Sequence, residues 1–181
     1  MFKFSMKSIA VAAVLLGGVA TAQADVTLRG ASMFDEEHAF TKTLREFERL
    51  VAENYDGEVS FDLRLNGELG VESDYVTYLN QGVAVDYTIL APSNMAVFSE
   101  SIPLMDMPFL FRDLEHWDAV LSSDALKPLE DDLREAAGIV IVGYHGGGVR
   151  NLASAEPITN MEELAGHRMR VMGAPIQAQT F

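Results

Sequence analysis

The residues best suited to bind a ligand are two arginines near the end of the chain. Arg150 lies two residues after a run of three glycines, and Arg170 lies in a stretch where charged and apolar residues alternate. That alternation predicts a strand over residues 168–172 that places Arg168 and Arg170 on one face. An arginine offers a planar fork of N–H donors that can hold a carboxylate through two parallel hydrogen bonds. The arginines therefore indicate a site for a small organic anion.

These arginines stand out against a strongly acidic background. The chain has 181 residues, with 27 Asp and Glu against 13 Lys and Arg, and a formal net charge of −14. Such a charge disfavours nucleic acid as a partner. The absence of cysteine excludes disulfides, thiolate metal sites and Cys nucleophiles. Acids close in sequence, such as Glu162 and Glu163, leave surface ion pairing as the alternative role for the arginines.

The histidines and the glycine run offer further chemistry. The histidines are His38, His116, His145 and His167, and none is paired at the helical i, i+4 spacing, so no metal site is predicted. His38, at the start of a predicted helix, either faces a cleft or has a capping or packing role. Residues 145–148 (His-Gly-Gly-Gly) resemble the oxyanion loop of some lipases and esterases. Since no G-x-S-x-G motif accompanies them, an exported hydrolase is only an alternative function, and a glycine hinge is the commoner explanation. No nucleotide-binding loop is found, so no cofactor is expected.

The first half of the chain predicts an α/β fold. Alternating and helical apolar patterns predict strands over residues 26–29, 59–65 and 87–90, with helices over residues 38–54 and 72–81 between them. Strands joined through helices pair in parallel by right-handed crossovers. Ligands of such sheets bind beyond the carboxyl ends of the strands, so the loops there are expected to form the cleft.

The second half predicts shorter elements. We expect helices over residues 114–121 and 125–137, a buried strand over 139–142 and an extended run over 149–154. Asn160, with Glu163 three residues later, predicts the start of a short helix. Pro175 begins a further element.

The N-terminal residues predict export. Lys3 and Lys7 flank a short polar start, an apolar run follows, and Ala22-Gln23-Ala24 supplies the small residues that a signal peptidase reads. Residues 1–24 are therefore expected to be a signal peptide, cleaved after Ala24, that directs the protein to the periplasm. The apolar run is too short for a stable membrane anchor.

Six motifs in order make the chain similar to one known family. They are residues 38–40, 66–70, 81–86, 103–111, 148–150 and 164–171. Together they resemble the solute-binding proteins of tripartite ATP-independent periplasmic (TRAP) transporters, the DctP-like family. The last two are the most specific, because they resemble the family's G-x-R and L-K-G-L-K-I-R-V elements. Glu68 departs from the Gln that is common in the family's N-x-Q-L-G turn.

The resemblance implies a receptor and no enzyme. A periplasmic-binding-protein-like clamshell of two α/β lobes would capture a small carboxylate and deliver it to the TRAP permease, driven by an ion gradient. A receptor for a sensor kinase is an alternative. Arg170 would be the principal carboxylate clamp and Arg150 a second contact, with Glu72, Asn94 and His38 as further pocket candidates.

The resemblance also divides the chain. Residues 25–147 would form the first lobe without its returning C-terminal elements, and residues 148–181 the start of the second lobe. Family members continue well beyond the strand that carries Arg170. We therefore expect the second lobe to be incomplete in this chain.

Overall fold

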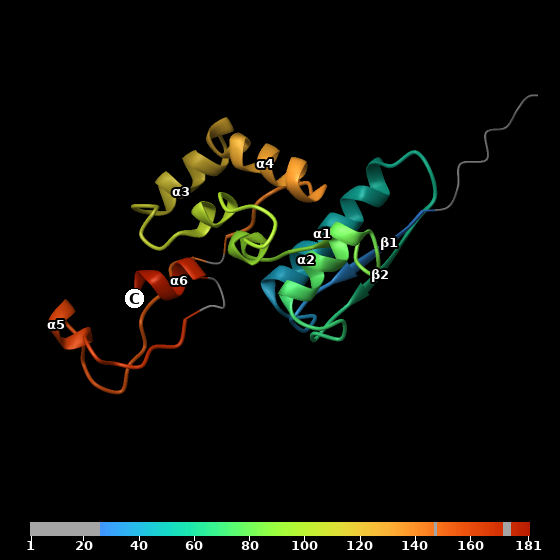
Figure 1. The fold of residues 1–181 in the computed structure, drawn as a ribbon. Helices are drawn as coiled ribbons and strands as arrows, with labels where there is room; N and C mark the ends of the chain where they lie inside the picture. The colour runs from blue at the N-terminus through green and yellow to red at the C-terminus, as the bar shows by residue number, and fades with distance from the viewer. Residues whose placement is uncertain (1–25, 147, 172–174) are drawn as a thin grey trace, which may run out of the picture.

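The computed structural model describes residues 26–146, 148–171 and 175–181, so the predicted signal peptide lies outside the described residues. Three parallel strands, β1 (Val26–Ala31), β2 (Val59–Arg64) and β3 (Tyr87–Thr88), form a sheet in the order β2-β1-β3. Helix α1 (Ala39–Asn54) connects β1 to β2, and α2 (Glu72–Gln81) connects β2 to β3 (Figure 1). The predicted α/β fold with parallel strands is confirmed.

The two helices cover opposite faces of the sheet. Phe47 of α1 packs on Tyr87 of β3, with ring centroids 5.3 Å apart. Tyr75 of α2 instead packs in a buried cluster with Ala31 of β1. Successive side chains of a strand point to opposite faces, so Gly30, which pairs with Tyr87, faces α1 while Ala31 faces α2. This arrangement brings the ends of β1 and β3 close to the start of α2.

A helical group follows the sheet (Figure 1). It contains the 3-10 turns η1 (Pro92–Met95), η2 (Ile102–Asp106) and η3 (Asp124–Leu126), with the helices α3 (Leu114–Leu121) and α4 (Lys127–Ala137). Helix α3 has the predicted bounds. The helix predicted over 125–137 is divided between η3 and α4, because Pro128 lacks a backbone N–H and belongs in a first helical turn. The main apolar core joins this group to α2 through Val76, Met95, Ile102, Met105, Leu126, Leu133, Ala137 and Ile139.

Two predicted strands are shorter than expected or absent. β3 ends at Thr88, because its partner β1 ends at Ala31, the residue paired with Thr88. The strand predicted over 139–142 is wrong. The side chains alternate as in a strand, with Ile139 buried and Val142 80% exposed, but no strand of the described residues pairs with this segment. A strand requires a neighbour for its backbone hydrogen bonds, so the pattern yields only an extended segment.

The C-terminal part contains the short helices α5 (Met161–Leu164) and α6 (Pro175–Thr180). Asn160 caps α5 as predicted, since its Oδ1 accepts from the backbone N–H of Glu163 at 2.9 Å. Residues 168–171 form no strand, because no described strand lies alongside them; residues 172–174 are outside the described part. Helix α5 projects away from the molecule, whereas α6 returns to the helical group, where Nε2 of Gln177 donates to the carbonyl oxygen of Asp106 at 3.2 Å (Figure 1).

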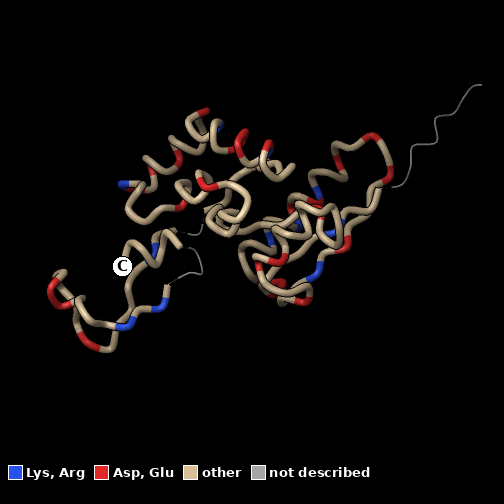
Figure 2. Tube along the Cα trace, in the orientation of Figure 1, with Lys and Arg blue, Asp and Glu red and all other residues tan. Residues whose placement is uncertain are grey.

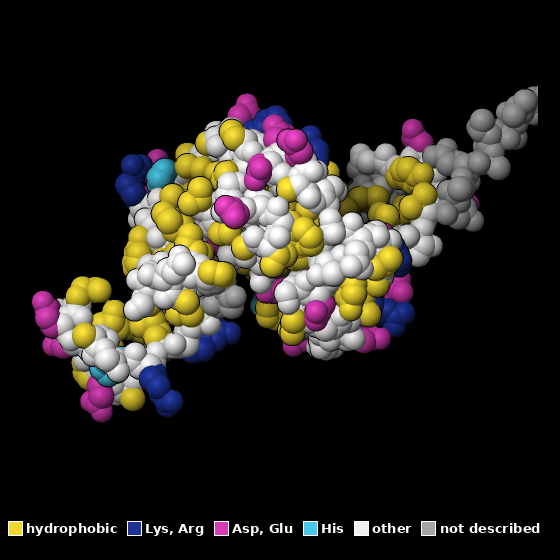
Figure 3. Space-filling model, viewed as in Figure 1, with side chains coloured by type: hydrophobic (Ala, Val, Ile, Leu, Met, Phe, Trp, Pro, Cys, Tyr) yellow, Lys and Arg dark blue, Asp and Glu magenta, His cyan; other side chains and the backbone are white. Residues whose placement is uncertain are grey.

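Acidic positions are distributed over helices and loops along the whole described chain (Figure 2). On the face drawn in Figure 3, acidic side chains are scattered over the α3–α4 group and form no single cluster. Arg168 and Arg170 lie on the segment between α5 and α6, which places positive charge in the part of the chain that follows the glycine run.

Candidate functional site

Two of the predicted pocket residues are in direct contact. Glu72 is the first residue of α2, and Asn94 lies in η1 beyond the end of β3. Nδ2 of Asn94 donates to Oε2 of Glu72 at 3.0 Å. Both residues follow strands at the carboxyl edge of the sheet, where ligands of parallel α/β folds bind. The structure therefore brings together side chains that are 22 residues apart in the sequence.

Arg150 is close enough to act on this pair electrostatically. Burial raises the pKa of Glu72, and the hydrogen bond from Asn94 and the positive charge of Arg150 partly offset that rise. The side chain of Arg150 is exposed, and it makes no hydrogen bond or ion pair with any described residue. Its guanidinium is therefore available to an incoming anion next to Glu72.

A hollow of about 340 Å³ lies beside these residues. It is lined by Ser73 of α2, by Ser93, Asn94, Ala96 and Val97 of η1 and the residues after it, and by Pro175 of α6. The lining combines hydroxyl and amide groups with apolar carbon, which is the mixture found in sites for small polar ligands. The hollow thus lies between α2, η1 with the residues that follow it, and the start of α6.

Arg170 is not joined to this group by any contact of the described residues. It is exposed on the segment before α6. The alternative role as an ion-pair partner of Glu163 is not seen either. Oε2 of Glu163 accepts from the backbone N–H of Thr159 at 2.7 Å and from its hydroxyl at 3.0 Å, and these bonds hold the pKa of Glu163 below its usual range.

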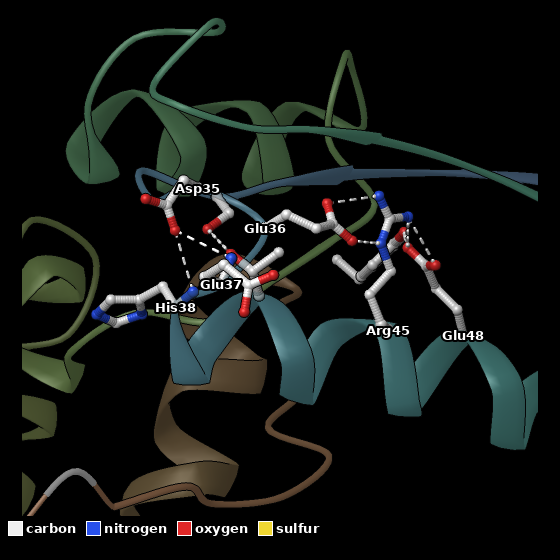
Figure 4. A network of polar contacts seen from close by, with 9 residues as sticks. Asp35, Glu36, Glu37, His38, Arg45 and Glu48 are labelled. Atoms are coloured by element: carbon white, nitrogen blue, oxygen red, sulfur yellow. Dashed lines mark hydrogen bonds and ion pairs between the residues drawn. The ribbon is translucent and has the colours of Figure 1, made fainter.

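His38 caps α1 (Figure 4). Its Nδ1 accepts from the backbone N–H of Phe40 at 3.1 Å, and its own backbone N–H donates to Asp35. The imidazole stacks on Phe34, with ring centroids 3.7 Å apart. Of the two roles open to His38 from sequence, the described contacts are those of a capping residue, and a ligand-binding role stays a prediction.

The first glycine of the run over residues 146–148 packs against an aromatic ring. A Cβ on Gly146 would lie 2.4 Å from the ring of Trp117, so only glycine allows this approach. His145 turns to α1, where its Nδ1 lies 3.2 Å from the hydroxyl of Thr43. Gly148 has a φ of +92°, in the left-handed region that favours glycine, and Gly147 lies outside the described residues. The close packing at Gly146 and the positive φ of Gly148 give these two glycines a structural role.

Sequence reasoning missed Asp106. This acid lies at the end of η2, inside the apolar run over residues 102–111, and its carboxylate contacts Ser93 at the wall of the hollow. A lone acid between Met105 and Met107 was a signal that the side chain has a specific partner, because an unpaired charge is disfavoured in such surroundings.

The part of the chain that the structure covers shows neither a metal-ligand cluster nor a membrane-spanning helix. Among the described residues no three His, Asp or Glu side chains are grouped to hold a metal ion. No helix there has the length and apolarity needed to cross a bilayer.

A parallel α/β lobe with a hollow of mixed polar and apolar lining, near an exposed arginine, is consistent with a solute-binding protein. The model of family 7 of the bacterial extracellular solute-binding proteins (DctP) matches residues 31–181, and the chain belongs to that family. The family consists of binding proteins, which favours the receptor interpretation over a hydrolase.

Individual relatives are consistent with this family. A solute-binding protein of Sulfitobacter sp. (strain NAS-14.1) is 76% identical over 172 residues, which cover 95% of this chain and 52% of the relative. A crystal structure of a TRAP periplasmic solute-binding protein from Sulfitobacter sp. NAS-14.1, with bound α-D-taluronate, is 77% identical with a TM-score of 0.81 and covers 86% of this chain and 50% of that one.

A more distant relative is similar to this chain in fold. The TRAP periplasmic solute-binding protein of Citrobacter koseri, with bound D-glucuronate, has a TM-score of 0.76 at 23% identity, over 85% of this chain and 52% of that one. The chain thus spans about half the length of the relatives it matches.

Proposed function

We propose that this protein is the periplasmic receptor of a TRAP transporter and that it binds a hexuronate, a sugar acid with one carboxylate and several hydroxyls. The observation that carries the proposal is the Glu72–Asn94 hydrogen bond at the edge of the hollow, with the exposed Arg150 close enough to act electrostatically on Glu72. The 77% identical Sulfitobacter protein holds such an acid, α-D-taluronate, which supports the same ligand class here.

The side chains match the chemistry of a sugar acid. Arg170 and Arg150 supply guanidinium donors for the ligand carboxylate. Glu72 offers acceptors, and Asn94 and Ser73 offer both donors and acceptors, to the hydroxyls of the sugar. His38, at the start of α1, is a further candidate at the rim of the cleft. A second ligand carboxylate near Glu72 would be repelled, so a monocarboxylate fits better than a dicarboxylate.

Export and delivery complete the proposal. Residues 1–24 would be removed after Ala24, and the loaded receptor would dock to the membrane permease in the periplasm. With a first lobe over residues 25–147 and a second lobe from residue 148, Arg150 and Arg170 would both belong to the second lobe. Closure of the lobes would then bring Arg170 toward Glu72, on which the charge of Arg150 already acts.

Calorimetric titration tests the ligand class. The protein is expressed with any sequence that follows Phe181 in its gene and is titrated with D-taluronate, D-glucuronate, succinate and D-galactose. We expect binding of the uronates alone. Removal of a charged contact to the carboxylate by Arg170→Ala is expected to cost roughly 2–5 kcal/mol. Binding of succinate in preference to the uronates, or full affinity in Arg170→Ala, would contradict the assignment.

Uptake tests the partner. Cells that carry the receptor together with its neighbouring permease genes should accumulate labelled uronate, and cells without the receptor should not. Uronate-dependent signalling without uptake would instead identify a receptor for a sensor kinase.

A further inference from the structure

Asp106 is a shielded carboxylate directly behind the hollow, and the roles assigned above do not use it. Its Oδ2 accepts from the hydroxyl of Ser93 at 2.8 Å and from the backbone N–H of Ser93 at 3.3 Å. Ser93 lines the hollow and is the second residue of η1, the turn that also carries Asn94. The carboxylate on η2 therefore caps η1 and fixes the wall of the candidate site.

The other oxygen of this carboxylate has no partner. Oδ1 of Asp106 is shielded from solvent and accepts no hydrogen bond from any residue that the structure describes. A shielded acceptor without a donor is costly, so native proteins provide a donor for nearly all of them. A donor close to Oδ1 is expected in the ligand-bound state of the protein.

Arg150 is the cation whose charge acts on this carboxylate. Burial raises the pKa of Asp106, and the hydrogen bonds from Ser93 and the charge of Arg150 act in the opposite direction. The same arginine acts on Glu72 across the site. Arg150 has five N–H donors on its guanidinium, enough to meet a ligand carboxylate with one edge and a protein carboxylate with another.

We propose that Asp106 is a positioning residue for the ligand site, which holds Ser93 at the hollow through Oδ2 and orients the guanidinium of Arg150 through Oδ1. This inference rests on the proposed function, because Arg150 acts there as a contact for the ligand carboxylate. Asp106 itself does not touch the ligand. Its backbone carbonyl also accepts from Gln177, so the same residue contacts α6.

The first test needs neither ligand nor an Asp106 variant. The carboxyl carbon of Asp106 is followed by NMR during a pH titration of the wild-type protein and of Arg150→Gln. We expect a higher pKa of Asp106 in Arg150→Gln, since a stabilising positive charge is lost. Arg168→Gln, a change of the same kind on an exposed neighbour, is the control and should leave that pKa in place. An equal pKa in wild type and Arg150→Gln would overturn the proposal.

The second test is a double-mutant cycle on uronate affinity. Asp106→Asn keeps an oxygen acceptor for Ser93 but presents N–H donors to Arg150. It therefore removes only the proposed interaction with Arg150. D-taluronate should bind to Asp106→Asn roughly tenfold more weakly or worse. In an Arg150→Lys background the same change should add little, because the two residues act as one unit. Additive losses would overturn the proposal.

Asp132→Asn is the matched control for this cycle. Asp132 also accepts from two serine hydroxyls, those of Ser99 and Ser101, but lies on α4 away from the hollow. Its variant should retain full affinity, both alone and relative to Arg150→Lys in the double variant, so this pair of changes should show no coupling. If wild-type protein binds no uronate, the proposed function fails together with this inference. If it binds uronate and the cycle is additive, only the role of Asp106 is refuted.

Discussion

The hydroxyl of Tyr87 on β3 donates a hydrogen bond to Oε1 of Glu48 on α1. The same glutamate, whose residue surface is only 9% exposed, accepts from Nη1 of Arg45 at 3.0 Å, and Arg45 also binds Glu36 (Figure 4). The two acids hold the pKa of Arg45 above its usual value. This network ties α1 to the edge of the sheet on which the candidate site depends.

Replacement of this buried acid should therefore destabilise the fold. We expect Glu48→Ala to lower the free energy of unfolding by about 2 kcal/mol, since it leaves the Tyr87 hydroxyl and Arg45 without their shared acceptor. Urea unfolding monitored by circular dichroism measures the change. Glu46→Ala, on the same helix but exposed in a pair with Arg49, should cost much less, because solvent screens an exposed ion pair. An equal loss of unfolding free energy in the two variants would show that the Tyr87–Glu48–Arg45 network does not stabilise the fold more than an exposed ion pair does.

Glu72 should make the protein less stable as the pH rises. Because burial raises its pKa, the folded protein takes up a proton at a higher pH than the unfolded chain does. Between the ordinary pKa and the raised one, stability therefore falls as pH increases, and it stays lower above that window. We expect Glu72→Gln to unfold at a higher urea concentration than wild type at neutral pH, with the difference vanishing in acid.

The measurement is a series of urea titrations from pH 4 to pH 8. The difference in unfolding free energy between Glu72→Gln and wild type at each pH gives the contribution of the Glu72 carboxyl. Glu58→Gln, an exposed change, is the control. The stabilised Glu72→Gln protein should also bind uronate more weakly. A variant with unchanged affinity would remove Glu72 from the site.

Gly146 should be required for packing. A methyl group there would meet the Trp117 ring at 2.4 Å, so Gly146→Ala forces a shift that is expected to cost roughly 1–3 kcal/mol. Gly143→Ala is the control, because a Cβ there meets nothing within 4 Å. Thermal unfolding compares them. If Gly146→Ala is as stable as Gly143→Ala, the packing role is refuted.

Gly30 presents the same constraint inside the sheet. A Cβ at this position would lie 2.4 Å from the ring of Tyr87 and 2.7 Å from the side chain of Leu63. Gly30→Ala should therefore cost roughly 1–3 kcal/mol through overpacking. Chemical denaturation measures it, and combining Gly30→Ala with Tyr87→Leu should recover part of the loss. A double variant no better than Gly30→Ala would contradict the proposed clash.

Local patterns predicted the first half of the fold well. The apolar spacing in α1 and α2 and the alternation in β2 are properties of the segments themselves, and each element forms within a residue of its predicted bounds. The extended segment over 139–142 shows the limit. Its alternation is real, but a strand also needs a neighbour, and pairing is not encoded in one segment.

The candidate site was predictable only in part. Glu72, Asn94 and Arg150 follow from the resemblance, and the proximity of Glu72 to Asn94 follows from the parallel fold. The contact between Asp106 and Ser93 joins two 3-10 turns whose geometry depends on the packing of Met95, Ile102 and Met105. Such packing is a tertiary property, so no sequence pattern showed that Asp106 reaches the hollow.

The packing of Trp117 against Gly146 also supplies an optical probe. Trp117 is the sole tryptophan of the chain, and the glycine that it covers lies four residues before Arg150. Indole emission depends on the surroundings of the ring, so a displacement of this segment as a ligand engages Arg150 would change the fluorescence of the unmodified protein. The engagement of a ligand can then be timed by stopped-flow mixing without attaching a dye.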